Sequence, residues 1–193
     1  GFHMVQLRHA KSLFRFQGVA DDRRCGLSCL AFGLRALSRD VRLRWLPVEK
    51  REDMEAIMIK PIMRNELLLG MPSEPATEQD VPIGQDLLDT LAAHADSCVG
   101  MAANMIGVRK RIIVFDNNGT PELMFNPEIM HASNRFKTEE GCLSLVGVRP
   151  CERFRKIHVA YQDASFVRHE KSFSGFTAQI IQHEIDHCNG ILI

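Results

Sequence analysis

The sequence predicts an α+β fold in which mostly antiparallel strands surround one central helix. Two apolar stretches, residues 111–115 and 123–125, flank the pair Asn118-Gly119, which is typical of a tight hairpin turn. Residues 157–161 alternate apolar and polar side chains, as a strand with one buried face does. A helical apolar pattern follows these strands near the C-terminus. Strands and helix are therefore separated along the chain, as in α+β proteins.

Composition favours one globular domain. The chain has 193 residues, of which 45% are hydrophobic, so it can build a substantial core without a second domain. Lys plus Arg and Asp plus Glu both number 24, which gives no indication of direct nucleic-acid binding. No apolar stretch approaches the length of a membrane span. No pattern in the sequence specifies an oligomeric state.

The first 53 residues differ from the rest. They are rich in arginine and contain the only tryptophan, Trp45, whereas Met54 resembles a natural start. Three interpretations stay open: vector or upstream sequence translated with the gene, an accessory segment that packs on the domain, or an organellar transit peptide. Six acidic residues disfavour the transit peptide. We therefore expect the catalytic domain at residues 54–193.

From Met54 the elements are predicted in order. Residues 57–69 are expected to be an extended lead-in broken at Pro61. Residues 77–80 resemble a capping box that opens a helix, and residues 98–107 are expected to form a loop. The inward face of the first helix is expected to carry Ile83, Leu87, Leu88, Leu91 and Ala92.

The last helix is predicted to begin near Ser174 and Gly175. Its apolar residues Ile181 and Ile185 are expected to pack inward, and Gly190 follows as a stop signal. This helix carries the most informative motif of the chain.

That motif is His183-Glu184-Ile185-Asp186-His187. On a helix, two histidines four residues apart project from the same face and can bind one metal ion. Glu184 lies beside that ion as a base for its bound water. The motif predicts a metallohydrolase.

A hydrolytic metal usually takes three protein ligands and keeps one position for water. Only six residues follow His187, so the third ligand is expected upstream. Cys142, within Glu140-Gly141-Cys142-Leu143-Ser144, is the candidate because a thiolate binds Fe(II), Zn and Ni strongly. The six cysteines show no disulfide pattern, which favours a reducing cytoplasm.

Three motifs in register resemble the peptide deformylase family. They are residues 98–107, the Glu-Gly-Cys-Leu-Ser segment 140–144, and Gln182 followed by the histidine motif. The resemblance covers roughly residues 54–193. It implies a bacterial cytoplasmic enzyme that removes the formyl group from N-formylmethionyl nascent peptides, near the ribosome. It also implies one divalent ion, Fe(II) natively, with Zn or Ni as replacements.

The resemblance also implies roles for individual residues. Glu184 would take a proton from water and then protonate the departing amine, while the backbone N–H of Leu143 would stabilise the oxyanion. Backbone groups near Val99 and Gly100 would pair with an extended peptide. Val99 and Phe176 would line the pocket for the methionine side chain.

Two positions depart from the family pattern. Cys98 replaces a glycine, and Met105 replaces the glutamine thought to hold the formyl oxygen. A thioether cannot donate a hydrogen bond, and loss of one oxyanion donor typically costs about 100- to 1000-fold in rate. Gln179, four residues before His183, either donates in its place or binds a nearby loop.

Two other functions remain as alternatives to a deformylase. One is a deformylase-like protein with low turnover that binds metal and peptides. The other is a general metallopeptidase, which the cysteine ligand and the lack of a downstream ligand disfavour.

Overall fold

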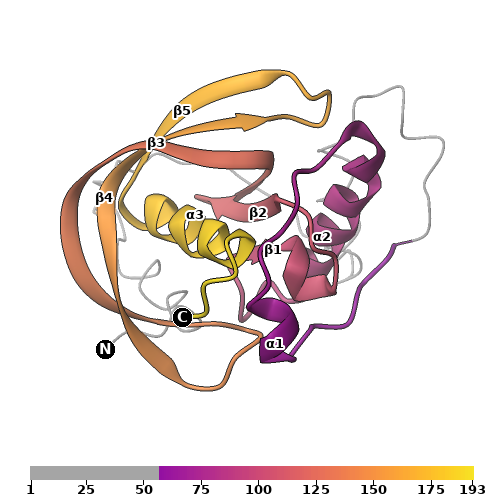
Figure 1. Cartoon of the computed structure of the whole chain (residues 1–193), viewed down its shortest axis with the longest axis horizontal. Coiled ribbons are helices and arrows are strands. Elements are labelled where there is room, and N and C mark those ends of the chain that lie inside the picture. Colours follow the sequence, from indigo (N-terminus) through magenta and orange to yellow (C-terminus); the bar gives the residue numbers. More distant parts are fainter. Residues whose placement is uncertain (1–56) are drawn as a thin grey trace, which may run out of the picture. The chain divides into compact units, whose positions relative to one another are not determined.

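The computed structural model describes residues 57–193, so the interpretations of residues 1–53 lie outside the described residues. Five strands form one sheet in the order β1-β2-β3-β4-β5, and each neighbouring pair is antiparallel (Figure 1). Within residues 57–193, three α-helices and two short 3₁₀ helices accompany the sheet. The predicted α+β class with antiparallel strands is confirmed. The strands are β1 Gly100–Ala102, β2 Ile112–Asn117, β3 Thr120–Gly141, β4 Val148–Gln162 and β5 Arg168–Ser174.

The second strand shows where the core lies. Ile112 and Val114 belong to one buried cluster, which includes residues of helix α2 (Val81–Ala93), whereas Ile113 and Phe115 belong to a second cluster with helix α3 (Gly175–Cys188). Successive side chains of a strand point to opposite faces. A strand covered on both faces is therefore continuously apolar, as residues 112–115 are.

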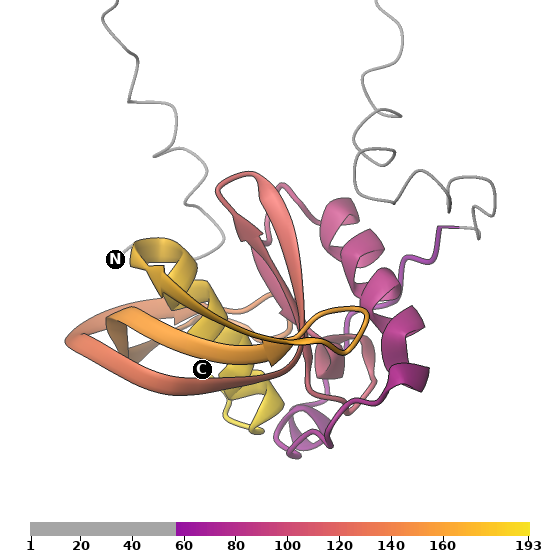
Figure 2. The same ribbon diagram turned by 90° about the horizontal axis from the view of Figure 1, so that it is seen from above.

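Helix α3 lies in the hollow formed by the long strands. It packs against β1, β2, β4 and β5, and Figures 1 and 2 show it in yellow within the bend of β3 and β4. Its central residues are accordingly buried, including Ile181 and Ile185. The predicted central helix, with its start after Ser174, is confirmed. Gly190 follows the helix with φ 73°, a conformation suited to glycine.

The predicted hairpin is also confirmed. Asn117 of β2 faces Thr120 of β3, and the two residues between them, Asn118 and Gly119, have φ 56° and 94°. Positive φ at both central residues is the requirement of the turn that Asn-Gly favours.

The strands β3 and β4 extend much further than the apolar stretches predict. Their pairing continues from Phe125 opposite Gln162 to Gly141 opposite Val148, with bulges between residues 125 and 131. Much of this ribbon is exposed on both faces, so it lacks the alternation that marks a half-buried strand. The ribbon ends at Gly141, and it thereby places Cys142 beside α3.

Helix α2 begins as predicted. Thr77 and Asp80 form a capping box around a short 3₁₀ turn, and α2 follows directly. Leu87 and Leu91 are buried, but Ala92 is exposed, so its predicted inward position is wrong. Ala92 is followed by only one more helical residue.

Two local expectations are corrected. The lead-in 57–69 is not extended to its end, because Glu66–Leu69 forms the short helix α1, capped by the side chain of Asn65. Residues 98–107 do not form a simple loop. They contain the edge strand β1 and a 3₁₀ helix, Ala103–Ile106.

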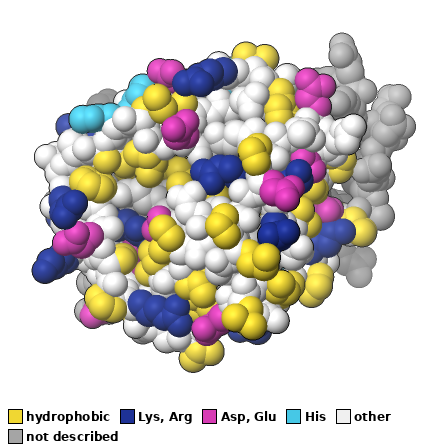
Figure 3. Space-filling view, viewed as in Figure 1, with side chains coloured by type: hydrophobic (Ala, Val, Ile, Leu, Met, Phe, Trp, Pro, Cys, Tyr) yellow, Lys and Arg dark blue, Asp and Glu magenta, His cyan; other side chains and the backbone are white. Residues whose placement is uncertain are grey.

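Helices of the described residues are all too short or too polar to cross a bilayer. On the face seen in Figure 3, basic and acidic side chains alternate, and neither sign gathers into a patch.

Candidate metal centre

Three buried side chains converge at the end of β3 and the last turns of α3. The Sγ atom of Cys142 lies 3.2 Å from Nε2 of His187, and the ligand atoms of Cys142, His183 and His187 all lie within 4.8 Å of one another. The backbone N–H of Ser144 donates to the Cys142 sulfur at 3.4 Å. The three residues that the sequence predicts as ligands are therefore brought together.

These residues fit a divalent ion. Ligand bonds of about 2.0 to 2.3 Å at tetrahedral angles place donor atoms roughly 3 to 4 Å apart, which is compatible with the observed spacing. Oε2 of Glu184, beside these residues, is buried without a hydrogen-bond partner among the described residues. Buried polar atoms are rarely left unpaired in native proteins, so this atom indicates an additional group in the site.

Glu184 is buried beside the ligand residues at 1% exposure. Burial raises the pKa of its carboxyl group to about 7, although the neighbouring charge of His183 acts in the opposite direction. A carboxyl group with a pKa near neutrality can both accept and return a proton.

Gly100 makes room for this carboxylate. A Cβ atom at position 100 would lie 2.7 Å from Oε1 of Glu184 and 2.6 Å from Cγ2 of Ile180. Both approaches are too close for a real side chain. The glycine on β1 is thus required by the packing of α3 against the edge strand.

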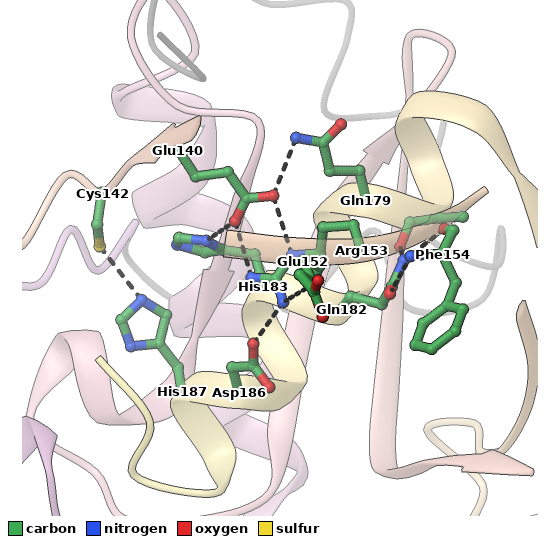
Figure 4. Close-up of polar contacts among 11 residues, drawn as sticks. Glu140, Cys142, Glu152, Arg153, Phe154, Gln179, Gln182, His183, Asp186 and His187 are labelled. Atoms are coloured by element: carbon green, nitrogen blue, oxygen red, sulfur yellow. Dashed lines mark hydrogen bonds and ion pairs between the residues drawn. The ribbon is translucent and has the colours of Figure 1, made fainter. Parts of the chain in front are cut away.

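A network of hydrogen bonds around Glu140 supports His183 (Figure 4). We call it the Glu140 network, and its members are Glu140, Arg153, Gln179, His183 and Asp186. Arg153 donates to Glu140 from Nε at 3.0 Å and from Nη2 at 2.8 Å, and its Nη1 donates to Asp186 at 2.7 Å. Nδ1 of His183 lies 2.8 Å from Oε2 of Glu140. Since an ionised carboxylate only accepts, His183 donates from Nδ1, and its neutral form offers the Nε2 lone pair to an ion.

Electrostatics distinguish the two histidines. Burial opposes charge on His183, but the neighbouring Cys142 and Glu140 groups outweigh it and raise its pKa to about 10. Burial and the proximity of His183 lower the pKa of His187 to about 3. Burial likewise opposes charge on Glu140, yet its bonds to His183 and Arg153 hold its pKa at about 2. Glu140 is therefore a permanent anion behind the site.

A small cavity opens beside these groups. Its volume is about 10 Å³, roughly that of one water-sized sphere. Met105 lies in its wall with the side chain almost fully buried, and its sulfur accepts a 3.5 Å hydrogen bond from the N–H of Ala102. The wall therefore contains a thioether acceptor at position 105. The lining residues are Ser97, Cys98, Val99, Gly100, Met105, Gly141, Cys142, Leu143, His183 and Glu184.

The structure places the other predicted residues in two groups. Val99, Gly100, Met105 and Leu143 lie in the cavity wall, and their roles toward a substrate stay predictions. Phe176 instead packs on the buried cluster around α3.

The amide of Gln179 is committed to the Glu140 network. It donates to Oε1 of Glu140 at 2.9 Å, so it points to the carboxylate and not to the cavity. The sequence left open a donor to the oxyanion or a hydrogen bond to a nearby loop, whereas the partner of this amide, Glu140, lies in strand β3.

Sequence reasoning did not identify Arg153, Asp186 or Gln182 as supporting residues, or Glu140 as more than part of a motif. Gln182 exchanges two hydrogen bonds with the backbone of Phe154, which fixes α3 on β4. The sequence contains one indication of these supporting residues. Glu140 directly precedes the Gly-Cys pair, whereas Arg153 lies outside the predicted strand 157–161, among other charged residues.

Comparisons with known proteins agree with this geometry. A family model described as polypeptide deformylase matches residues 60–193. A peptide deformylase from Clostridium beijerinckii is 51% identical over 136 residues, which span 70% of this chain and 100% of the relative.

Solved structures give the same result. A peptide deformylase from Thermotoga maritima matches with a TM-score of 0.64 at 31% identity, over 69% of this chain and 94% of the other. A Met-Ala-Ser-bound class I type b peptide deformylase from Acinetobacter baumannii matches with a TM-score of 0.63 at 29% identity, over 71% and 97%.

Proposed function

The chain belongs to the polypeptide deformylase family, and from that premise we propose that Cys142, His183 and His187 hold the divalent ion of its active site. As a member, the protein is a hydrolase that removes the formyl group from newly made polypeptides. The observation that carries the assignment of the ligands is the convergence of one sulfur and two imidazoles beside the buried Glu184.

A bound ion supplies a water of lowered pKa and polarises the formyl oxygen. Glu184 takes the proton from the attacking water, whose oxygen adds to the formyl carbon. The C–N bond then breaks as Glu184 returns the proton to the departing amine, and the products are formate and a free N-terminus. The pKa of Glu184, about 7, supports both roles.

The backbone N–H of Leu143 is the donor that we assign to the developing oxyanion. Leu143 lies in the cavity wall directly after Cys142, which supports this role. Met105 contributes no donor at the same wall. We therefore expect slower turnover than a second side-chain donor would permit.

The edge strand β1 is the place that we assign to the peptide. Its other side pairs with β2, and Val99 and Gly100 lie in the cavity wall. An extended peptide can add to such an edge through main-chain hydrogen bonds. Formylmethionyl nascent chains, near the ribosome, are the substrates we propose.

Fe(II) is the native ion that we propose, because one thiolate and two imidazoles suit it, and Zn or Ni fit the same donors. A ligating thiolate needs reducing surroundings, and the four cysteines among the described residues are free. Both points support a bacterial cytoplasm.

Formate release tests the function. The chain is loaded with Fe(II) under anaerobic conditions and offered formyl-Met-Ala-Ser, with the unformylated peptide and metal-free protein as controls. We expect formate from the loaded protein alone and no cleavage of the unformylated peptide. Peptide binding without formate would instead favour the low-turnover alternative, and cleavage of Met-Ala-Ser would favour a general metallopeptidase.

A further inference from the structure

Gln179 and His183 lie one turn apart on α3 and contact the same carboxylate (Figure 4). Nε2 of Gln179 donates to Oε1 of Glu140 at 2.9 Å, and Nδ1 of His183 lies 2.8 Å from Oε2. Residues four apart on a helix share a face, so the pair binds Glu140 as a clamp. The clamp joins α3 to the C-terminal end of β3.

Glu140 has every acceptor position filled. Its Oε1 accepts from Nε of Arg153 and from Gln179, and its Oε2 accepts from Nη2 of Arg153 and from His183. An ionised carboxylate offers about four lone-pair positions. Four donors from two elements therefore fix both the place and the rotation of this carboxylate.

Gln179 is the least buried of the residues that donate to Glu140. Glu140, Arg153 and His183 are all buried, whereas Gln179 is half-buried and reaches solvent. A carboxylate that loses this donor keeps an unmet acceptor position in a buried place, which is costly. Arg153 and His183 then remain as its donors, and the carboxylate can tilt about these bonds and carry the imidazole of His183 with it.

We propose that Gln179 is a positioning residue for the metal ligand His183, acting through Glu140. It holds the carboxylate in the rotation that directs Nε2 of His183 toward Cys142 and His187. This inference rests on the proposed metal site. It gives Gln179 a role in metal retention, in place of the oxyanion role that the sequence left open.

Metal affinity tests this role directly. Gln179→Met keeps the length and flexibility of the side chain but removes its donor. We expect its affinity for Co(II), measured anaerobically by competition with a chelator, to fall about tenfold, the lower end of the usual effect of losing a supporting bond. The absorption bands of the bound cobalt should shift, because the angle of one ligand changes.

Gln85→Met is the matched control. Gln85 lies on α2, and its Nε2 donates at 3.1 Å to Asp89, four residues away. The same substitution there also removes a hydrogen bond from a helical glutamine to a carboxylate, but outside the metal centre, and we expect cobalt affinity and spectrum to stay unchanged. Gln179→Lys, which retains an N–H donor, should bind cobalt nearly as well as the unmodified chain.

Unchanged cobalt affinity and spectrum in Gln179→Met would overturn the role of Gln179. If Gln179→Met does not fold, as judged by circular dichroism, the same measurements are made on Gln179→Leu. Cys142→Ala separates this failure from failure of the proposed site. If Cys142→Ala binds cobalt as tightly as the unmodified chain, the metal site itself is wrong.

Discussion

Single residues of the segment 98–107 decide what the active-site cavity can do. Gly100 gives its side-chain space to Glu184, and Met105 presents a buried sulfur where a donor would assist catalysis. Both lie in the wall beside the ligand residues. We propose that the first favours proton transfer and that the second limits stabilisation of the oxyanion.

A donor introduced at position 105 should raise the rate. We expect Met105→Gln to release formate from formyl-Met-Ala-Ser at least about ten times faster, because a single oxyanion donor is worth 100-fold or more when well placed. Met105→Leu, which also lacks a donor, is the control and should not gain. A glutamine variant no faster than the leucine variant would show that the missing donor does not limit the rate.

A side chain at position 100 should displace the base. In Gly100→Ala, the new Cβ would lie 2.7 Å from Oε1 of Glu184, so the carboxylate must move. We expect kcat to fall by roughly 100-fold or more, the usual worth of a positioned base, while one metal ion per chain is still bound. Wild-type kcat in this variant would mean that Glu184 is not held where the structure places it.

Sequence reasoning predicts the proposed metal ligands, but not the residues that hold them in place. His183 and His187 follow from helical spacing, which is a local property. Arg153 and Glu140 meet through pairing of β3 with β4 and packing against α3, and neither relation is visible in a local pattern. The sequence likewise does not show whether the amide of Gln179 donates to the oxyanion or to another part of the chain.

Three elements are joined by one buried arginine. Arg153 on β4 binds Glu140 on β3 and Asp186 on α3, and it is only 5% exposed. A buried charge is tolerated when it is paired, and loss of one partner leaves the other uncompensated. Arg153 therefore holds the ribbon of β3 and β4 against the helix that carries the histidines.

Removal of this charge should destabilise the fold. We expect Arg153→Met to lower the free energy of unfolding by about 3 to 5 kcal/mol, measured by urea denaturation of the metal-free protein. Arg135→Met is the control, because Arg135 pairs with Glu152 at the surface, and its loss should cost about 1 kcal/mol or less. Equal effects of the two substitutions would contradict the structural role of Arg153.

Sequence patterns predict a helix or strand when at least one of its faces is buried, and they fail when neither face is. The apolar run of β2 and the helical pattern of α3 predict both elements. Strand β5 has Phe173 as its one buried residue, and charged side chains occupy much of the rest, so its sequence does not mark a strand. It forms because β4 offers it an edge for pairing.

At the scale of the whole molecule, function and stability oppose one another. The core on both faces of the sheet stabilises the fold, but it also buries Glu184 without a partner for one oxygen among the described residues. A buried carboxylate without full compensation is costly when ionised. Burial of Glu184 therefore lowers the stability of the fold, and we propose that this cost keeps a base beside the metal ion.

This conflict predicts a pH dependence for the metal-free protein. Burial raises the pKa of Glu184 from 4.5 to about 7, so between these values the folded state holds a proton that the unfolded state has lost. The stability that this proton provides is present below pH 4.5 and is lost as the pH rises through 7.

We expect the stability advantage of Glu184→Gln over the unmodified chain to grow by about 3 kcal/mol from low pH to pH 8. Urea denaturation at several pH values measures it. The exposed Glu139→Gln is the control and should show a constant difference. A constant difference for Glu184→Gln as well would mean that this carboxyl group is not shifted.

The most direct test of the account is formate release by Glu184→Gln at equal metal content. The variant and the unmodified chain are loaded with Fe(II) to one ion per chain and given formyl-Met-Ala-Ser. The account predicts that the variant binds the ion through Cys142, His183 and His187 but releases formate at least about 100-fold more slowly. Equal rates at equal metal content would contradict it.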